Sequence, residues 1–299
     1  MEYVIETRDL NKNFGPTRVL KDINLQVSKG SIFGLVGPNG AGKTTTIRLL
    51  MGTLKPTMGT VSVLGLDSWK QGVELRQRVG YVAEKAALYP YMQVQELMRF
   101  NAGLYKNWDW DVANRLLNQF DLPRASKIKE LSKGMCTQVA LTLALCCRPE
   151  LLILDEPTSN LDPVWRRQFL QVLTKEVAER ETTVLFSSHI LSDLERVADW
   201  VGIITHGKLQ AVRQLDDMKF NERKIRIVFQ GSPPEDLLTR PGIKNVERQG
   251  SGFLITIEDN FDEIYSALGK VPHFLLEVVE QDLETIFLEY AEPGGGKLV

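Results

Sequence analysis

A glycine-rich stretch from Gly37 to Thr44 has the spacing G-x-x-x-x-G-K-[ST] and lies between a short apolar run and a segment of helical character. Glycines let such a loop curl so that backbone N–H groups point at phosphate oxygens, and the following helix N-terminus adds partial positive charge. Lys43 would place a full charge on the β- and γ-phosphates of a nucleotide, and the Thr44 hydroxyl would ligate Mg²⁺. The predicted phosphate-binding residues are Gly37, Pro38, Asn39, Gly40, Ala41, Gly42, Lys43, Thr44 and Thr45.

Two acidic residues, Asp155 and Glu156, follow the apolar run Leu151–Leu154. A carboxylate at the end of a buried strand can hold Mg²⁺ through water, and this role is assigned to Asp155. Glu156 lies one residue beyond and is the candidate for polarising the attacking water. A solvated strand end is the alternative, and the phosphate loop in the same chain disfavours it. Together the two elements predict Mg²⁺-dependent nucleotide hydrolysis.

Short apolar runs alternate with helical segments over the first 215 residues or so, which predicts a mainly parallel sheet covered on both faces. Val4–Leu10 and Ile23–Val27 alternate apolar and polar residues, which predicts antiparallel strands with one exposed face. Residues 85–149 carry helical patterns and are interpreted as a helical insertion. The runs predicted as parallel strands are Ser31–Val36, Leu151–Leu154, Thr183–Phe186 and Val201–Thr205.

The pattern changes near residue 219, so we predict an α/β domain over 1–218 and a small α+β domain over 219–299. The predicted order in the second domain is strand-helix-strand-strand-helix-strand, which is typical of a ferredoxin-like fold. Its expected elements are Lys224–Gln230, Pro234–Thr239, Val246–Gln249, Phe253–Ile257, Phe261–Leu268 and His273–Val279, with a final helix at Asp282–Tyr290.

The stretch Leu131–Asp162 reads LSKGMCTQVALTLALCCRPELLILDEPTSNLD, and His189 follows in the sequence SSHIL. With the Gly37–Thr44 loop, this order of motifs resembles the ATPase subunit of an ABC transporter over about residues 3–215. The resemblance implies a P-loop NTPase fold of the ABC type, with an antiparallel β subdomain. It also implies a subunit of the exporter type that binds ATP and Mg²⁺ and drives a separate integral membrane permease.

The resemblance also implies roles for single residues. Ser132 precedes an apolar helical run and can cap its N-terminus; in the family, Ser132 and Gly134 would contact the γ-phosphate of ATP bound to the opposite subunit. His189 would bind the γ-phosphate, and Phe14 would stack on adenine, with core packing as the alternative for Phe14. One complete set of motifs predicts a homodimer, or a heterodimer with a related ATPase.

The motifs depart from the family pattern in two informative places. The signature, usually LSGGQ, has Lys133 and Met135 here, while Ser132 and Gly134 remain. Glu84 stands where the family usually has Gln, so an anion would face Mg²⁺ or the attacking water. We expect altered metal affinity or slower turnover. A Glu here also resembles exporters with separate ATPase and permease chains.

Composition narrows the range of partners. The formal net charge is −2, and no run of 18 apolar residues or secretory leader is visible, so neither nucleic-acid binding nor a membrane span is expected. The odd count of three cysteines favours a reducing compartment. We expect a cytoplasmic protein, peripheral at the inner face of the membrane through its permease. The region of Tyr89, Tyr91 and Met92 is either the permease docking surface or ordinary packing.

Two other functions stay open on the sequence. One is a nucleotide-gated switch with negligible hydrolysis, which Glu84 and Met135 make conceivable. The other is a soluble ABC protein that acts on nucleic acid or ribosomes. Such chains usually carry coiled coils or a second ATPase half, and the sequence contains neither feature.

Overall fold

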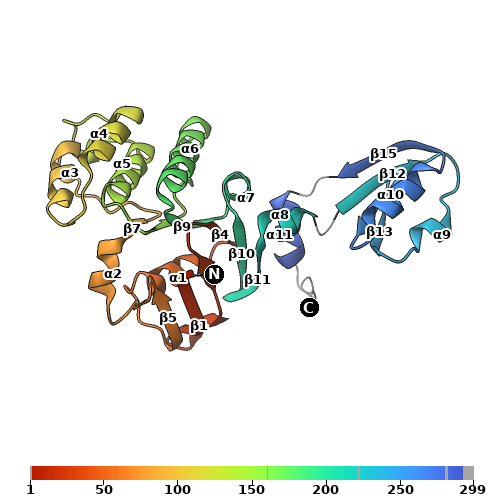
Figure 1. Ribbon diagram of the computed structural model, residues 1–299, viewed down its shortest axis with the longest axis horizontal. Coiled ribbons are helices and arrows are strands. Elements are labelled where there is room, and N and C mark those ends of the chain that lie inside the picture. Colours follow the sequence, from red (N-terminus) through yellow and green to blue (C-terminus); the bar gives the residue numbers. More distant parts are fainter. Residues whose placement is uncertain (1, 160, 221–222, 280–281, 292–299) are drawn as a thin grey trace. The chain divides into compact units, whose positions relative to one another are not determined.

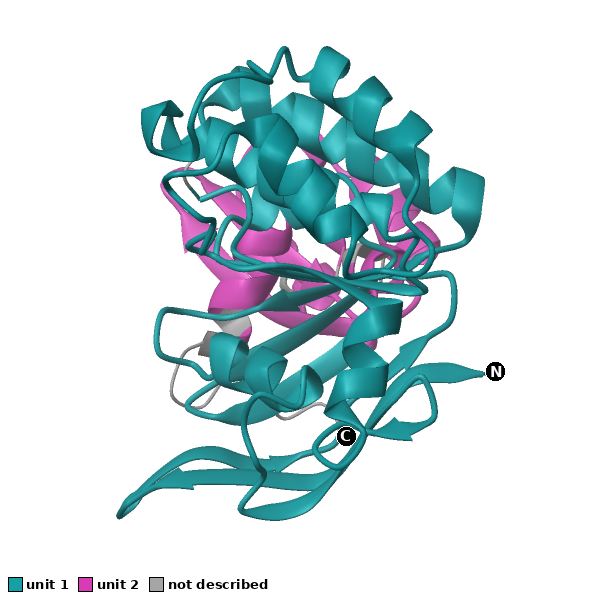
Figure 2. Cartoon of the chain, turned by 90° about the vertical axis from the view of Figure 1, so that its left-hand side faces the viewer, with its two compact units in different colours: residues 1–212 teal, residues 213–299 magenta. Residues whose placement is uncertain are grey.

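The computed structural model describes residues 2–159, 161–220, 223–279 and 282–291, and it divides into two compact units, residues 1–212 and 213–299 (Figure 2). The sequence placed this boundary between residues 218 and 219. Each unit has its own buried apolar core.

A six-stranded sheet, ordered β11-β10-β4-β9-β8-β7, forms the centre of the first unit (Figure 1). The pairs β7–β8, β8–β9, β9–β4 and β4–β10 are all parallel, which confirms the predicted mainly parallel sheet. Its β4 and β8 strands are buried at every residue, as expected for strands covered on both faces. The strands are β4 (Ile32–Val36), β7 (Val79–Val82), β8 (Leu151–Asp155), β9 (Thr183–Ser188), β10 (Trp200–Thr205) and β11 (Lys208–Gln214).

Helices lie on both faces of this sheet (Figure 2). Between residues 83 and 150, all of which the structure describes, the chain is helical and contains no strand, only an isolated bridge between Gln93 and Lys127. This is the predicted helical insertion, made of α3 (Val94–Ala102), α4 (Trp110–Gln119), the 3₁₀ turn η1 (Ile128–Glu130) and α5 (Lys133–Cys146). The remaining helices of the unit are α1 (Lys43–Leu50), α2 (Gly72–Arg78), α6 (Pro163–Arg180) and α7 (Leu191–Leu194).

A second, antiparallel sheet contains β1 (Tyr3–Phe14), β2 (Thr17–Ile23), β3 (Gln26–Ser28), β5 (Met58–Val63) and β6 (Leu66–Asp67). The predicted strand Ile23–Val27 is wrong as a single element, because β2 ends where it should begin and β3 starts at Gln26. Asp22 has a left-handed φ of 52°, which turns the chain there. Asn24 then bridges the gap, since its side-chain oxygen accepts from the N–H of Asp9 at 2.8 Å.

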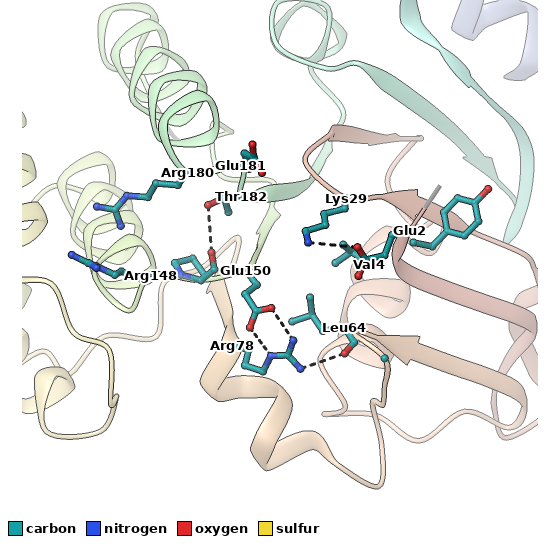
Figure 3. Close-up of a pocket in the computed structure, with 13 residues that line it drawn as sticks. Glu2, Val4, Lys29, Leu64, Arg78, Arg148, Glu150, Arg180, Glu181 and Thr182 are labelled. Atoms are coloured by element: carbon teal, nitrogen blue, oxygen red, sulfur yellow. Dashed lines mark hydrogen bonds and ion pairs between the residues drawn. The ribbon is translucent and has the colours of Figure 1, made fainter.

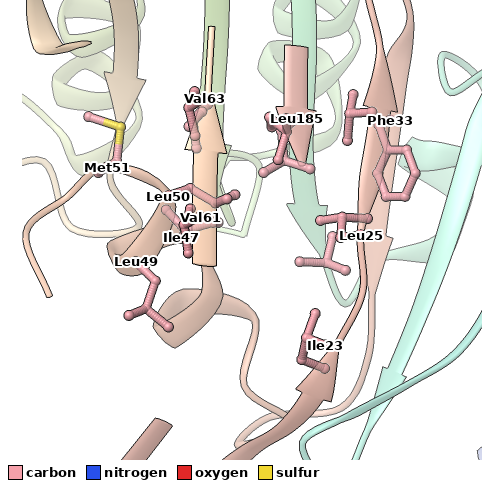
Figure 4. Packing of buried hydrophobic residues seen from close by; sticks show 14 of the residues in the cluster. Ile23, Leu25, Phe33, Ile47, Leu49, Leu50, Met51, Val61, Val63 and Leu185 are labelled. Carbon is pink, nitrogen blue, oxygen red and sulfur yellow. The ribbon is translucent and has the colours of Figure 1, made fainter. Parts of the chain in front are cut away.

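One apolar cluster holds the two sheets and α1 together (Figure 4). Ile47 and Leu50 of α1 pack there with Leu35 of β4, Val63 of β5 and Leu185 of β9, and all are fully buried. Because α1 follows the glycine-rich loop directly, this packing fixes the loop at the end of β4.

The second unit contains a four-stranded sheet ordered β13-β14-β12-β15, with every neighbouring pair antiparallel. Ile225, Ile227, Ile255 and Ile264 belong to its core. The elements run in the order β12 (Arg223–Phe229), α9 (Glu235–Leu238), β13 (Ile243–Gln249), β14 (Gly252–Ile257), α10 (Phe261–Gly269) and β15 (His273–Val279), flanked by α8 (Leu215–Phe220) and α11 (Leu283–Ala291).

Candidate functional site

The glycine-rich loop connects β4 to α1 and forms one wall of a cavity of about 490 Å³. Gly42 is the N-cap of α1 at a φ of 113°, where a side chain would be strained. A Cβ at Gly37 would lie 2.2 Å from the carbonyl oxygen of Ile204 in β10, so only glycine fits against that strand. The predicted residues that line the cavity are Pro38, Asn39, Gly40, Gly42, Lys43, Thr44, Thr45, Glu84, Glu156 and His189.

Gly37 and Ala41 support the loop from behind. Ala41 is buried; its N–H donates to the carbonyl oxygen of Pro38 at 3.1 Å, and its own carbonyl accepts from Gly207. The loop is therefore held both to itself and to the turn after β10.

Lys43 is 5% exposed and reaches back across the loop. Its Nζ donates to the carbonyl oxygen of Gly37 at 2.6 Å and lies 3.1 Å from Oε1 of Glu156. A buried ammonium paired with a buried carboxylate is a strongly coupled arrangement. The cation is thus fixed at the centre of the loop, where a phosphate group would lie.

Asp155 ends β8 and lies beside the start of α1. Its Oδ1 accepts from Thr44 Oγ1 at 3.2 Å and from Ser187 Oγ at 2.9 Å. Burial raises the pKa of the Asp155 carboxyl, the hydrogen bonds from Ser187 and Thr44 oppose that shift, and the charges of Glu156 and Glu84 add to it. A divalent cation would relieve this crowding of negative charge, because it favours the ionised carboxylate.

Glu156 follows β8 immediately and adopts a left-handed φ of 50°. Its N–H donates to the carbonyl oxygen of Ser187 at 3.1 Å, which fixes the backbone beside β9. Its Oε2 lies 2.6 Å from Nδ1 of His189 and accepts from the His189 N–H at 3.2 Å. The carboxylate therefore lies between Lys43 and His189, and the imidazole is half exposed toward the cavity.

The oxygen atoms of Thr44, Asp155 and Glu84 fit a hard divalent cation such as Mg²⁺. Among the described residues, no cluster of three or more His, Cys, Asp or Glu side chains forms a metal cage. In proteins, Mg²⁺ is usually held by one or two protein ligands together with substrate phosphates and water.

Three predicted contact residues, Ser132, Gly134 and Phe14, do not line this cavity. Ser132 caps α5 as expected, its Oγ accepting from the Met135 N–H at 3.1 Å, but neither Ser132 nor Gly134 is among the described residues that line the cavity. Phe14 is 50% exposed at the end of β1, with Lys12 Nζ 5.0 Å from its ring centroid, so the alternative of core packing is wrong. Asn160, within the stretch Leu131–Asp162 that carries the resemblance, lies outside the described residues.

Sequence reasoning missed Ser187, which contacts both Asp155 and Glu156. It also missed Val19 of β2 and did not assign Ser159 to the cavity wall. The only local signal for Ser187 was its position two residues before His189. Its role depends on the pairing of β8 with β9, because Asp155 is the register partner of Ser187.

A larger cavity, of about 780 Å³, lies on the opposite edge of the central sheet, where β8 and β9 begin (Figure 3). Arg78 donates to both carboxylate oxygens of Glu150 there, at 2.6 and 2.8 Å. Arg148 and Arg180 both contact Asp109. Because these three arginines are already paired with carboxylates, none of them is free to bind a phosphate. The cavity lies where several secondary-structure elements meet.

The comparisons with known proteins agree with one another. A family model described as ABC transporter matches residues 20–159. The ABC transporter ATP-binding protein YtrB of Bacillus subtilis is 32% identical over 285 residues, which span 95% of this chain and 97% of that protein. The bacitracin transport ATP-binding protein BcrA of Bacillus licheniformis is 36% identical over 226 residues, spanning 75% of this chain and 74% of that protein.

A solved structure, described as the ATP binding subunit of an ABC transporter, is 31% identical with a TM-score of 0.66 and covers 72% of this chain and 92% of that chain. Within the described part of this chain, no helix is long and apolar enough to cross a membrane. The phosphate loop, the carboxylates after β8 and a relative matched along nearly its whole length all lead to the same assignment. The chain belongs to the ABC transporter family and is one of its ATP-hydrolysing cassettes.

Proposed function

We propose that this cassette drives a separate membrane permease in the direction of export, and that Glu156 is its catalytic base. The single observation that carries the site assignment is the position of the Glu156 carboxylate, 3.1 Å from Lys43 Nζ and 2.6 Å from His189 Nδ1. A carboxylate that a rigid strand holds beside the phosphate loop is positioned to take a proton from water once a phosphate has displaced it from Lys43.

The remaining side chains divide the work of phosphoryl transfer. Lys43 and the loop N–H groups bind the β- and γ-phosphates. His189, which lies on the opposite side of the Glu156 carboxylate from Lys43, also binds the γ-phosphate. Thr44, Asp155 and Glu84 would hold Mg²⁺, which supplies neutralising charge on the phosphates when bound. Most of the rate enhancement then comes from positioning and charge stabilisation.

A second chain completes the site in this proposal. Ser132 and Gly134 lie at the N-terminus of α5 and outside the cavity of their own chain, so they are available to the nucleotide of a partner. The partner is a second copy or a related ATPase. Phe14 is exposed and available to stack on adenine.

The permease would dock on an exposed aromatic cluster in the helical insertion. Tyr89 and Tyr91 are exposed with ring centroids 6.0 Å apart, and Phe100 meets Tyr89 edge-on at 5.6 Å. Met92 lies beside them in sequence. An exposed group of aromatic side chains is typical of a protein interface. Docking there would hold the cassette at the inner face of the membrane. The proposed direction rests on Glu84, which resembles the residue of exporters with separate ATPase and permease chains, and on the similarity to BcrA, a bacitracin transport ATP-binding protein.

The test is steady-state ATP hydrolysis by the purified chain and by Glu156→Gln. We expect the variant to lose at least about 10²-fold in turnover, because it removes a general base, while it still binds ATP. Glu179→Gln, on an exposed part of α6, is the matched control and should hydrolyse normally. Normal steady-state hydrolysis by Glu156→Gln would refute the assignment. Tight ATP binding with no hydrolysis by the unmodified chain would favour a nucleotide-gated switch.

A further inference from the structure

One arginine lies between the two segments that follow the catalytic strands. The segment after β8 carries Glu156 and leads into α6, and the segment after β9 carries His189 and leads into α7. Arg166, in the first turn of α6, donates from Nη2 to the carbonyl oxygen of Leu161 at 3.4 Å. Its Nε lies 3.7 Å from Oδ2 of Asp193 in α7. Arg166 therefore connects these two segments at a place that does not line the cavity.

The Arg166–Asp193 ion pair is largely shielded from water, but its two nearest charged atoms are too far apart to form a hydrogen bond. The side chain of Asp193 is 2% exposed and that of Arg166 is 28% exposed. Both Nε of Arg166 and Oδ2 of Asp193 are buried without a hydrogen-bond partner among the described residues. A separation of 3.7 Å is too long for a hydrogen bond, and leaving both charged atoms unsatisfied is costly. A small movement of α7 toward α6 that shortens this distance would let the two atoms form a hydrogen bond.

Each end of the pair leads to a proposed nucleotide-contacting residue. On one side, the N–H of Asp193 donates to the carbonyl oxygen of Ile190, the residue next to His189, at 3.2 Å. On the other side, Cδ2 of Leu161 lies 3.3 Å from the position that a Cβ on Gly134 would occupy. Leu161 is buried against the start of α5. A movement at His189 can thus reach Gly134 through Asp193, Arg166 and Leu161.

We propose that Arg166 is a positioning residue that couples the state of His189 to the Leu161–Gly134 contact through its ion pair with Asp193. The inference rests on the proposed roles of His189 and Gly134. Engagement of His189 by a γ-phosphate closes the Arg166–Asp193 pair, and the closed pair fixes the carbonyl of Leu161. Arg166 does not line the nucleotide cavity, so its loss should affect turnover and leave the affinity for ATP in place.

The experiment compares Arg166→Gln with Arg167→Gln, a matched control on the neighbouring exposed arginine. We expect Arg166→Gln to lower kcat about tenfold, since small misplacements of catalytic groups cost one to two orders of magnitude, with KM for ATP changed by less than about twofold. Arg167→Gln should behave as the unmodified protein. Normal kcat in Arg166→Gln would overturn the proposal, and so would a rise in KM with unchanged kcat.

A double-mutant cycle separates coupling from simple structural damage. Asp193→Asn should lower kcat to the same degree, and the double variant should be no slower than either single variant, because both changes remove one interaction. Effects that multiply in the double variant would refute the pair. Arg166→Lys keeps a positive charge near Asp193, but it lacks the guanidinium group that contacts both Asp193 and Leu161. Its kcat should therefore lie between that of Arg166→Gln and that of the unmodified protein. Equal kcat values for the Lys and Gln variants would show that the charge is irrelevant.

Two measurements keep this result independent of the proposed function. Thermal melts of all variants identify any that fail to fold, and Arg166→Lys then carries the test. Glu156→Gln, measured in the same series, tests hydrolysis at this site by itself. Loss of hydrolysis in Glu156→Gln together with normal kcat in Arg166→Gln would refute the coupling and leave the proposed function intact.

Discussion

Nδ1 of His189 lies 2.6 Å from Oε2 of Glu156, although the two residues are 33 positions apart in the chain. The parallel pairing of β8 with β9 brings them together, because the ends of both strands meet at the same edge of the sheet. We therefore expect a substitution of either residue, the proposed base or the proposed γ-phosphate contact, to change the position of the other.

The first prediction concerns His189. His189→Ala should lower kcat by about 10- to 10²-fold, since it removes both the proposed phosphate contact and the side chain hydrogen-bonded to Glu156. Steady-state hydrolysis measures this loss. His206→Asn is the control, because His206 lies in the turn between β10 and β11 at a φ of 50°, a conformation that asparagine accepts. An unchanged kcat in His189→Ala would remove His189 from the site.

The second prediction concerns Lys43. Lys43→Ala should lose ATP binding, because it removes the buried cation from the phosphate loop and takes away the ammonium group that faces Glu156. Equilibrium binding of labelled ATP provides the measurement. The control is Lys70→Ala, at an exposed lysine paired with Asp67. Wild-type affinity in Lys43→Ala would contradict the assignment of the loop.

The third prediction concerns the stability of the nucleotide-free protein. Burial raises the pKa of Asp155 in the folded state, so its ionised form destabilises the fold at pH values above that pKa. Asp155→Asn removes this cost while an amide oxygen can still accept from Thr44 and Ser187. We expect the free energy of unfolding at pH 7 to rise by about 1 kcal/mol, with loss of hydrolysis. Urea unfolding without nucleotide measures the change, and a destabilised variant would contradict it.

The fourth prediction concerns the departure at Glu84. Glu84→Gln removes one carboxylate from the cavity wall, and Asp155 then experiences less repulsion. With one anionic ligand fewer, Mg²⁺ should bind more weakly, and half-maximal hydrolysis should need more Mg²⁺. A titration of hydrolysis against Mg²⁺ tests this. The same Mg²⁺ dependence in Glu84→Gln and the unmodified chain would exclude Glu84 from the metal site.

The fifth prediction concerns acid stability at the opposite edge of the sheet. The hydrogen bond from Arg78 lowers the pKa of Glu150 in the folded state. The resulting stabilisation is present above the unfolded-state pKa of about 4.3 and is lost as the pH falls through the lower, folded-state pKa. Because Glu150 is half exposed, the contribution is only about 0.5 kcal/mol.

Urea unfolding at pH 7 and pH 3 tests this contribution. The unmodified protein should lose more stability between the two pH values than Glu150→Gln does. Glu179→Gln, at an exposed pair on α6, should lose as much as the unmodified protein. Equal losses in the Glu150→Gln and unmodified proteins would refute the role of this pair.

Local sequence patterns were sufficient to predict the parallel sheet and to identify most of the residues that line the cavity. The loop before α1 and the carboxylates after β8 are each encoded within a few neighbouring residues. Strands with little apolar content were missed: β5 is mostly exposed over Met58–Thr60, and β7 is only four residues long and contains Gly80. Their assignment depends on partners far along the chain, β1 for β5 and β8 for β7.

The roles of side chains that act through tertiary contacts could not be predicted from the sequence either. Ser187 supports Asp155 only because β8 and β9 are in register, and Arg166 meets Asp193 only because α6 and α7 follow adjacent strands. In the sequence, Arg166 and Arg167 look alike. Only the fold distinguishes the arginine that lies over a buried carboxylate from the one that faces solvent.

The contact between Lys43 and Glu156 has a further consequence for the resting protein. Without nucleotide, Lys43, which should bind phosphate, is paired with Glu156, which should activate water. Neither side chain is then free for its proposed role. In the proposed mechanism, an incoming γ-phosphate would compete with Glu156 for the ammonium group, and the carboxylate would be free to act on water only after a phosphate has taken its place. In the proposed mechanism, this ion pair would lower the affinity for nucleotide and make the base available only when the substrate is bound.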